Sequence, residues 1–88
     1  MSSTVIRWSV EIFLSGIDGH SHAEARLLSG AETPLTATGT AALSERDPVD
    51  VPEIGYELAT ARALWSLADK LLSTAAEDVE AIADPDHD

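Results

Sequence analysis

The first half of the chain alternates between apolar and polar residues, which is typical of strands with one buried face. Three segments carry the alternation and are predicted as strands: residues 4–14, 22–29 and 35–43. Turn-forming residues separate them at 15–19 and 30–34. The expected inward positions are Ile6, Trp8, Val10, Ile12 and Leu14 in the first strand, and Ala23, Ala25, Leu27, Leu35, Ala37, Gly39, Ala41 and Leu43 in the other two. Short links join antiparallel neighbours, so we expect a three-stranded antiparallel meander with one face toward water.

The pattern changes to a helical period near Pro52, after a loop at residues 44–52. Proline suits the first position of a helix, where its missing N–H would have no partner. Glu53 and Glu57 then lie near the positive end of the helix dipole. At about 100° per residue, six apolar residues fall on one stripe. These are Ile54, Leu58, Ala61, Trp65, Ala68 and Leu72. We expect this stripe to pack on the inner face of the sheet.

The inner positions of the second and third strands are mostly Ala or Gly, so large side chains must fill the core from elsewhere. Trp8 from the first strand and Trp65 from the helix are the expected fillers, because small strand residues let the helix approach closely while the indoles occupy the volume. On this interpretation the replacement Trp65→Ala costs roughly 3–5 kcal/mol.

A second apolar arc follows on the same helix, formed by Leu64, Leu67 and Leu71. It lies about 80–140° from the centre of the sheet-facing stripe, and one sheet does not easily cover both arcs. Either a short C-terminal helix at residues 75–83 folds back over these leucines, or another subunit covers them, and the two can hold together. Leu64, Leu67 and Leu71 are therefore the candidate partner- or dimer-binding residues.

The expected fold class is α+β, with a three-stranded antiparallel meander followed by one long helix and a short C-terminal helix, in the order β-β-β-α-α. The 88 residues are long enough for one domain with a modest core, expected to be ordered over about residues 4–83 with an acidic tail at 84–88. Without cysteines, self-association is one way to supplement such a core. The N-terminus lacks a secretory signal and no apolar run is long enough for a bilayer, so we expect a cytoplasmic protein without a membrane role.

Sixteen acidic residues against five basic ones give a formal charge of −11, and residues 44–88 hold twelve of the acids and three of the bases. Such a surface repels phosphate backbones and anionic lipids, because nucleic-acid affinity depends on Lys and Arg. The negative charge is explained by a need for solubility. The more specific alternative explanation is that the acidic surface binds a basic partner. Arg7 and Arg26 are expected on one face near Glu11 and Glu24, as cross-strand ion pairs.

Candidate chemistry is confined to Asp18, His20 and His22, two histidines two apart with a carboxylate nearby. A zinc or iron site needs three or four converging ligands, and the other available histidine is His87 in the tail. No motif for a nucleophile with its general base appears in the sequence. The sequence therefore predicts no enzyme and no cofactor.

The chain resembles an actinobacterial family of small proteins of unknown function, whose mycobacterial members are associated with hypoxia and dormancy. The resemblance covers residues 5–82, and the distinctive run is Val51-Pro52-Glu53-Ile54-Gly55. The other segments that carry the resemblance are Trp8-Ser9-Val10-Glu11-Ile12, Ala23-Glu24-Ala25-Arg26-Leu27, residues 35–43, Glu57-Leu58 and Ala61-Arg62-Ala63-Leu64. The resemblance implies three strands followed by a helix, a fold similar to double-stranded-RNA-binding domains and to part of ribosome hibernation factors, and intertwined or tightly packed dimers.

We therefore expect a small cytoplasmic, non-catalytic, stress- or dormancy-associated binding protein that acts as a homodimer through protein–protein interaction. The alternative is a ribosome- or RNA-associated hibernation-like factor, in which a local basic strip escapes the global repulsion. A minor alternative is a metal-dependent enzyme that uses His20 and His22.

Overall fold

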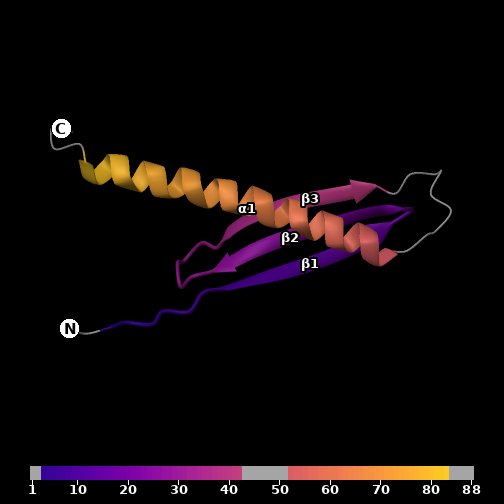
Figure 1. Ribbon diagram of the computed structural model, residues 1–88, viewed down its shortest axis with the longest axis horizontal. Helices are drawn as coiled ribbons and strands as arrows, with labels where there is room; N and C mark the ends of the chain where they lie inside the picture. Colours follow the sequence, from indigo (N-terminus) through magenta and orange to yellow (C-terminus); the bar gives the residue numbers. More distant parts are fainter. Residues whose placement is uncertain (1–2, 43–51, 84–88) are drawn as a thin grey trace.

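The computed structural model describes residues 3–42 and 52–83, which form one antiparallel sheet and one long helix (Figure 1). The elements are β1 (Ser9–Ile17), β2 (His20–Leu28), β3 (Leu35–Ala42) and α1 (Pro52–Ala83). The strands follow one another across the sheet in the order β1-β2-β3, each antiparallel to the next. The helix lies on one face of the sheet, which confirms the predicted α+β fold of a meander followed by a long helix.

A two-residue turn, Asp18-Gly19, joins β1 to β2. The φ angles are 50° at Asp18 and 78° at Gly19, and positive φ at both central residues is the hairpin geometry that matches the right-handed twist of strands. The turn is shorter than the predicted turn at residues 15–19, because Ser15 and Gly16 still pair with His22 and Ser21. As a result β1 extends to Ile17, beyond the predicted end at Leu14. It begins at Ser9, so residues 4–8, which the alternating pattern had assigned to the strand, precede it.

The inner face of the sheet is formed by small side chains, as predicted for β2 and β3. Its buried residues are Ser21, Ala23, Ala25, Leu27, Ala37, Gly39 and Ala41. Leu43, also predicted to face inward, lies outside the described residues. In β1, Ile12 packs against this core, whereas Val10 and Leu14 keep more than two fifths of their surface exposed. The core is therefore centred on β2 and β3.

The stripe of α1 that faces the sheet consists of Gly55, Ala59, Ala63 and Leu67, with Leu71 packed at its end. The predicted stripe was wrong: Ile54, Leu58, Trp65 and Leu72 are all exposed. The reason lies in β3, where a Cβ on Gly39 would collide with backbone atoms of Ala59 and Ala63. The helix backbone rests directly on this glycine, so only Gly or Ala fits the stripe where helix and sheet are closest.

The two tryptophans do not fill the core, contrary to the prediction. Trp65 is 74% exposed and Trp8 is 56% exposed. An indole needs more depth than the small-residue contact between α1 and the sheet offers, because both layers meet at backbone distance. No large side chain is fully buried among the described residues.

The helix continues unbroken to Ala83, so the separate C-terminal helix predicted at residues 75–83 is not present. Neither Gly nor Pro occurs between Leu72 and Ala83 to end it. A helix of 32 residues is about 48 Å long, whereas strands of eight or nine residues span about 30 Å. Burial on the sheet stops at Leu71, and the rest of α1 extends beyond the sheet (Figure 1).

The α1 helix crosses β2 and β3 and leaves most of β1 uncovered. Two basic side chains of α1 form hydrogen bonds to the outer edge of β3. Arg62 donates to the carbonyl oxygen of Thr40 at 2.7 Å, and Lys70 donates to that of Thr36 at 2.6 Å. These side chains occupy edge carbonyls that would otherwise accept hydrogen bonds from another strand.

The close contact at Gly39 yields a first prediction. In Gly39→Ala the new methyl group meets helix backbone, which cannot rotate away, so α1 must shift from the sheet. We expect a loss of roughly 1–3 kcal/mol in the free energy of unfolding, measured by urea denaturation. Thr38→Ala, on the exposed face of the same strand, is the control and should change stability by less than about 1 kcal/mol. Equal stability of Gly39→Ala and the wild type would show that the contact is not tight.

A second prediction compares two neighbouring large residues of α1. Trp65→Ala removes an exposed side chain and should change the free energy of unfolding by less than about 1 kcal/mol. Leu67→Ala opens a cavity in the core and should cost about 2–5 kcal/mol. Thermal or urea unfolding of both variants measures the difference, and the reverse order would restore the original assignment of the stripes.

Candidate functional site

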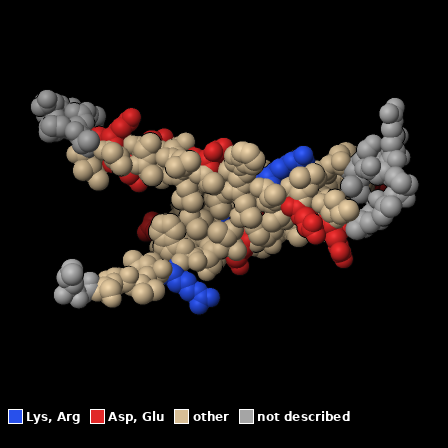
Figure 2. Space-filling model, in the orientation of Figure 1, with Lys and Arg blue, Asp and Glu red and all other residues tan. Residues whose placement is uncertain are grey.

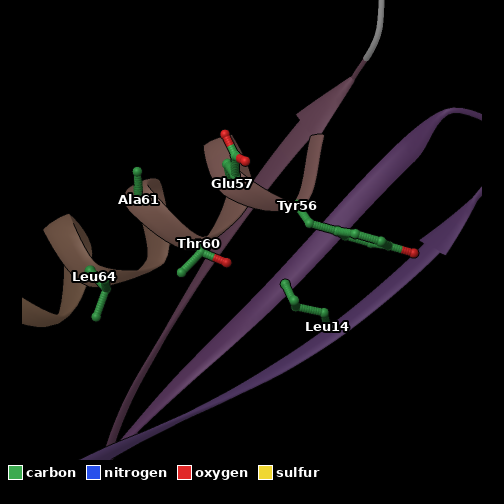
Figure 3. A pocket seen from close by; sticks show the side chains of 6 residues that line it. All are labelled: Leu14, Tyr56, Glu57, Thr60, Ala61 and Leu64. Atoms are coloured by element: carbon green, nitrogen blue, oxygen red, sulfur yellow. The ribbon is translucent and has the colours of Figure 1, made fainter. Parts of the chain in front are cut away.

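The helix and the uncovered strand β1 border an open apolar groove of ≈ 390 Å³ (Figure 3). The groove forms because α1 packs on β2 and β3. The inner face of β1 therefore lies beside the helix and is not covered by it. The lining residues are Leu14, Tyr56, Glu57, Thr60, Ala61 and Leu64. Leu14 rises from β1 toward the helix, and the remaining side chains come from three successive turns of α1.

Tyr56 closes one end of the groove. Its ring lies across β1 (Figure 3), where a Cβ on Gly16 would be 2.9 Å from the hydroxyl oxygen of Tyr56. Gly16 therefore provides the space in which the half-buried ring packs on the strand backbone. Leu64 stands two turns further along α1 and remains 42% exposed. The groove thus has an aromatic end, an aliphatic end and an open top.

The groove is lined mainly by apolar groups and is therefore suited to receiving apolar side chains. Its one charged lining residue is Glu57, and its hydroxyl groups belong to Thr60 and Tyr56. These residues supply no nucleophile paired with a general base and no set of converging metal ligands. What the arrangement offers is an apolar surface of defined shape, which is the usual property of a protein-contact site.

The structure separates the three leucines predicted as a partner-binding arc. Leu64 is exposed and lines the groove, whereas Leu67 is 3% exposed in the core and Leu71 packs against that core. The expectation that all three lie away from the sheet is wrong for Leu67 and Leu71. Its cause is the helical offset described above: the sheet-facing stripe of α1 is centred on small residues, which the apolar pattern did not favour. A binding role for Leu64 stays a prediction.

His20 and His22 lie on the outer face of the sheet, opposite the helix, and are exposed. They line a depression of ≈ 390 Å³ together with Ser15, Ile17 and Thr40. Within residues 3–42 and 52–83, no three His, Cys, Asp or Glu side chains come together as metal ligands do. His87, the further ligand considered from the sequence, lies outside the described residues. The depression therefore lends no support to the metal-dependent alternative.

Arg26 is held on the same outer face by two contacts. It forms an ion pair with Glu24 at 3.0 Å and lies over the ring of Phe13, 4.9 Å from its centroid. This ion pair joins two residues of β2, whereas the sequence predicted pairing across strands; Glu11 stands opposite Arg26 in the register without an ion pair between them. Arg7 precedes β1 and is not part of the sheet. The half-exposed ion pair contributes little stability, and an arginine engaged in this way adds little to a nucleic-acid surface.

The sequence pattern missed the groove although it placed its strand wall correctly. Leu14 was assigned to the inner face, which is where it lies. Tyr56, Thr60 and Leu64 share a helix face at steps of four residues, and that spacing is the signal that could have indicated the other wall.

In the described part of the chain, no helix has the length and apolar content that crossing a membrane requires.

The comparisons with known proteins agree with this architecture. The model of the Rv2632c-like family matches residues 6–87. The uncharacterized protein MT1780 of Mycobacterium tuberculosis is 40% identical over 75 residues, which cover 85% of this chain and 78% of that protein. The uncharacterized protein Rv2632c of the same species is 39% identical over 74 residues, covering 82% and 75%. The crystal structure of Rv2632c superposes with a TM-score of 0.81 and 33% identity, covering 94% of this chain and 96% of the other.

Proposed function

This chain belongs to the Rv2632c-like family, and on that premise we propose that it is a small, cytoplasmic, non-catalytic binding protein that acts as a homodimer in a stress or dormancy response. The association with stress and dormancy is carried by the family resemblance alone. The binding function and the dimer are supported by features of the chain itself, above all by the open apolar groove between β1 and α1.

The molecule exposes far more surface than a compact monomer of its size. Its accessible surface is 7264 Å², whereas a folded monomer of 9.3 kDa exposes about 5,000 Å². Its radius of gyration is 18.0 Å, against about 12 Å for a compact domain of 88 residues. Part of this exposed area belongs to large apolar residues of the described fold, such as Val5, Ile6 and Trp65.

Much of this surface is apolar and lies beside the groove or near the N-terminus. Val5 is 95% exposed and Ile6 is 76% exposed, and Val10 and Leu14 extend the apolar surface along the uncovered inner face of β1. A second copy would bring the same surfaces, so that each can cover the other in a two-fold arrangement. Covering them would also complete a core that now consists mainly of alanine.

The single observation that carries the proposal is the open groove between β1 and α1, with Leu64 at its rim. An apolar groove without catalytic or metal-binding side chains supports recognition rather than chemistry. We assign the dimer contact to this groove and to the adjoining face of β1.

The dimer is tested by light scattering coupled to size-exclusion chromatography. We expect the wild type at twice its chain mass of 9.3 kDa at micromolar concentration. Leu64→Glu places a charge at the rim of the groove and should raise the dimer dissociation constant at least tenfold, a change of about 1.4 kcal/mol. Because Leu64 is exposed within one chain, helix content by circular dichroism should stay the same.

Leu28→Glu provides the matched control, since Leu28 has similar exposure but lies at the end of β2 on the outer face. It should leave the dimer intact. A wild type that runs as a monomer would refute the homodimer, and equal effects of the two variants would remove the groove as its site.

A further inference from the structure

The most extensive apolar stripe of α1 points away from its own sheet. It consists of the residues first expected to face the sheet, Ile54, Leu58, Ala61, Trp65, Ala68 and Leu72, and continues through Val79. Leu72 is 69% exposed and Val79 is 63% exposed. These residues recur at steps of three, four and seven, the spacing that forms a contact line between two packed helices. We call this line the outward stripe.

Acidic side chains border the outward stripe on both sides. At about 100° per residue, Glu57 lies about 60° from the centre of the stripe on one side, and Asp69 and Glu80 lie about 60–80° from it on the other. Acidic side chains are visible at both ends of α1 in Figure 2, whereas basic ones are sparse. In a pair of packed helices these flanking positions meet the flanks of the partner helix and select its charge.

The two cations of α1 do not offset these acids along the stripe. Arg62 and Lys70 both turn toward β3, where they donate to backbone carbonyl oxygens. The last turn of α1 contains no basic residue, although cations are favourable at the negative end of a helix dipole. Glu77, Asp78 and Glu80 occupy this end instead. Of these three, Glu80 borders the outward stripe, so the C-terminal end of the stripe carries an acidic flank and no basic residue of its own.

We propose that the outward stripe docks an amphipathic helix of another protein, whose apolar face is flanked by Lys and Arg. This inference rests on the proposed binding function and specifies the chemistry of the partner. Charge complementarity decides among the occupants, because a second copy of α1 would bring the same acids against Glu57, Asp69 and Glu80. Like charges in these positions disfavour pairing. Nucleic acids and anionic membranes are disfavoured for the same reason.

The test uses the full-length chain and a synthetic helical peptide of about four heptads, with Leu along one face and Lys on both flanks. A matched peptide carries Glu in place of Lys. Binding is followed by the fluorescence of Trp65 in a Trp8→Phe background, since Trp65 is exposed and lies within the outward stripe. We expect a saturable blue shift with the Lys peptide, affinity at least about tenfold weaker with the Glu peptide, and weakening of the Lys complex as salt rises.

Two substitutions locate the site. Leu72→Ser should weaken binding of the Lys peptide at least about tenfold, whereas Ile17→Ser, at an equally exposed apolar residue of β1, should leave it unchanged. Asp69→Asn should weaken the Lys peptide and not the Glu peptide, because it removes one flanking charge. Equal binding of both peptides, binding of neither, or equal effects of Leu72→Ser and Ile17→Ser would overturn the proposal.

Light scattering on the same samples separates this proposal from the homodimer. If Leu72→Ser abolishes the dimer, a second copy occupies the outward stripe, which overturns the basic partner and leaves the homodimer, but not its assignment to the groove, standing. If the wild type is a monomer that binds the Lys peptide with the expected charge dependence, the homodimer is refuted and the basic partner is supported.

Discussion

The fold depends on one contact, the approach of the α1 backbone to Gly39 of β3. A Cβ at this position would collide with helix backbone, so helix and sheet meet without any intervening side chain. That distance fixes the composition of both layers, because only small residues fit beside it: Ala59 and Ala63 on the helix, Ala37 and Ala41 on the strand. It also leaves the monomer with little buried volume, and hence with larger apolar residues at its surface.

This constraint explains which parts of the structure followed from the sequence. The alternation of Ala23, Ala25 and Leu27 predicted the buried face of β2 correctly, and Pro52 marked the start of the helix. The contact face of α1 was not predictable from apolar periodicity, because Gly55 and Ala59 carry little hydrophobic signal while Trp65 carries much. In the candidate site Leu64 was expected to be available and is exposed, whereas Leu67 was taken up by the core. The short distance between helix and sheet at Gly39 is a property of three-dimensional packing, and the pattern of apolar residues along the sequence does not contain it.

The helix consequently has two apolar faces with different roles. Its small-residue face holds the sheet, and its larger residues are distributed between the groove beside β1 and the outward stripe. The groove lies next to an uncovered strand and is nearly free of charge, which suits a surface presented by a second copy. The outward stripe is bordered by acids, which suits a partner of opposite charge. The two surfaces adjoin, because Ala61 belongs to both and Glu57 borders both, and we propose one for assembly and the other for recognition.

The hydrogen bonds from Arg62 and Lys70 to β3 also limit how far the sheet can grow. A sheet with two open edges can add strands from neighbouring chains without end, which is the route to fibrils. Here two carbonyl groups of the β3 edge, those of Thr36 and Thr40, already accept hydrogen bonds, which disfavours the addition of a strand at β3 relative to β1. Two chains joined along β1 would present capped β3 edges at both ends. Growth by this route is disfavoured beyond two chains, which lowers the risk of polymerisation at an exposed strand edge.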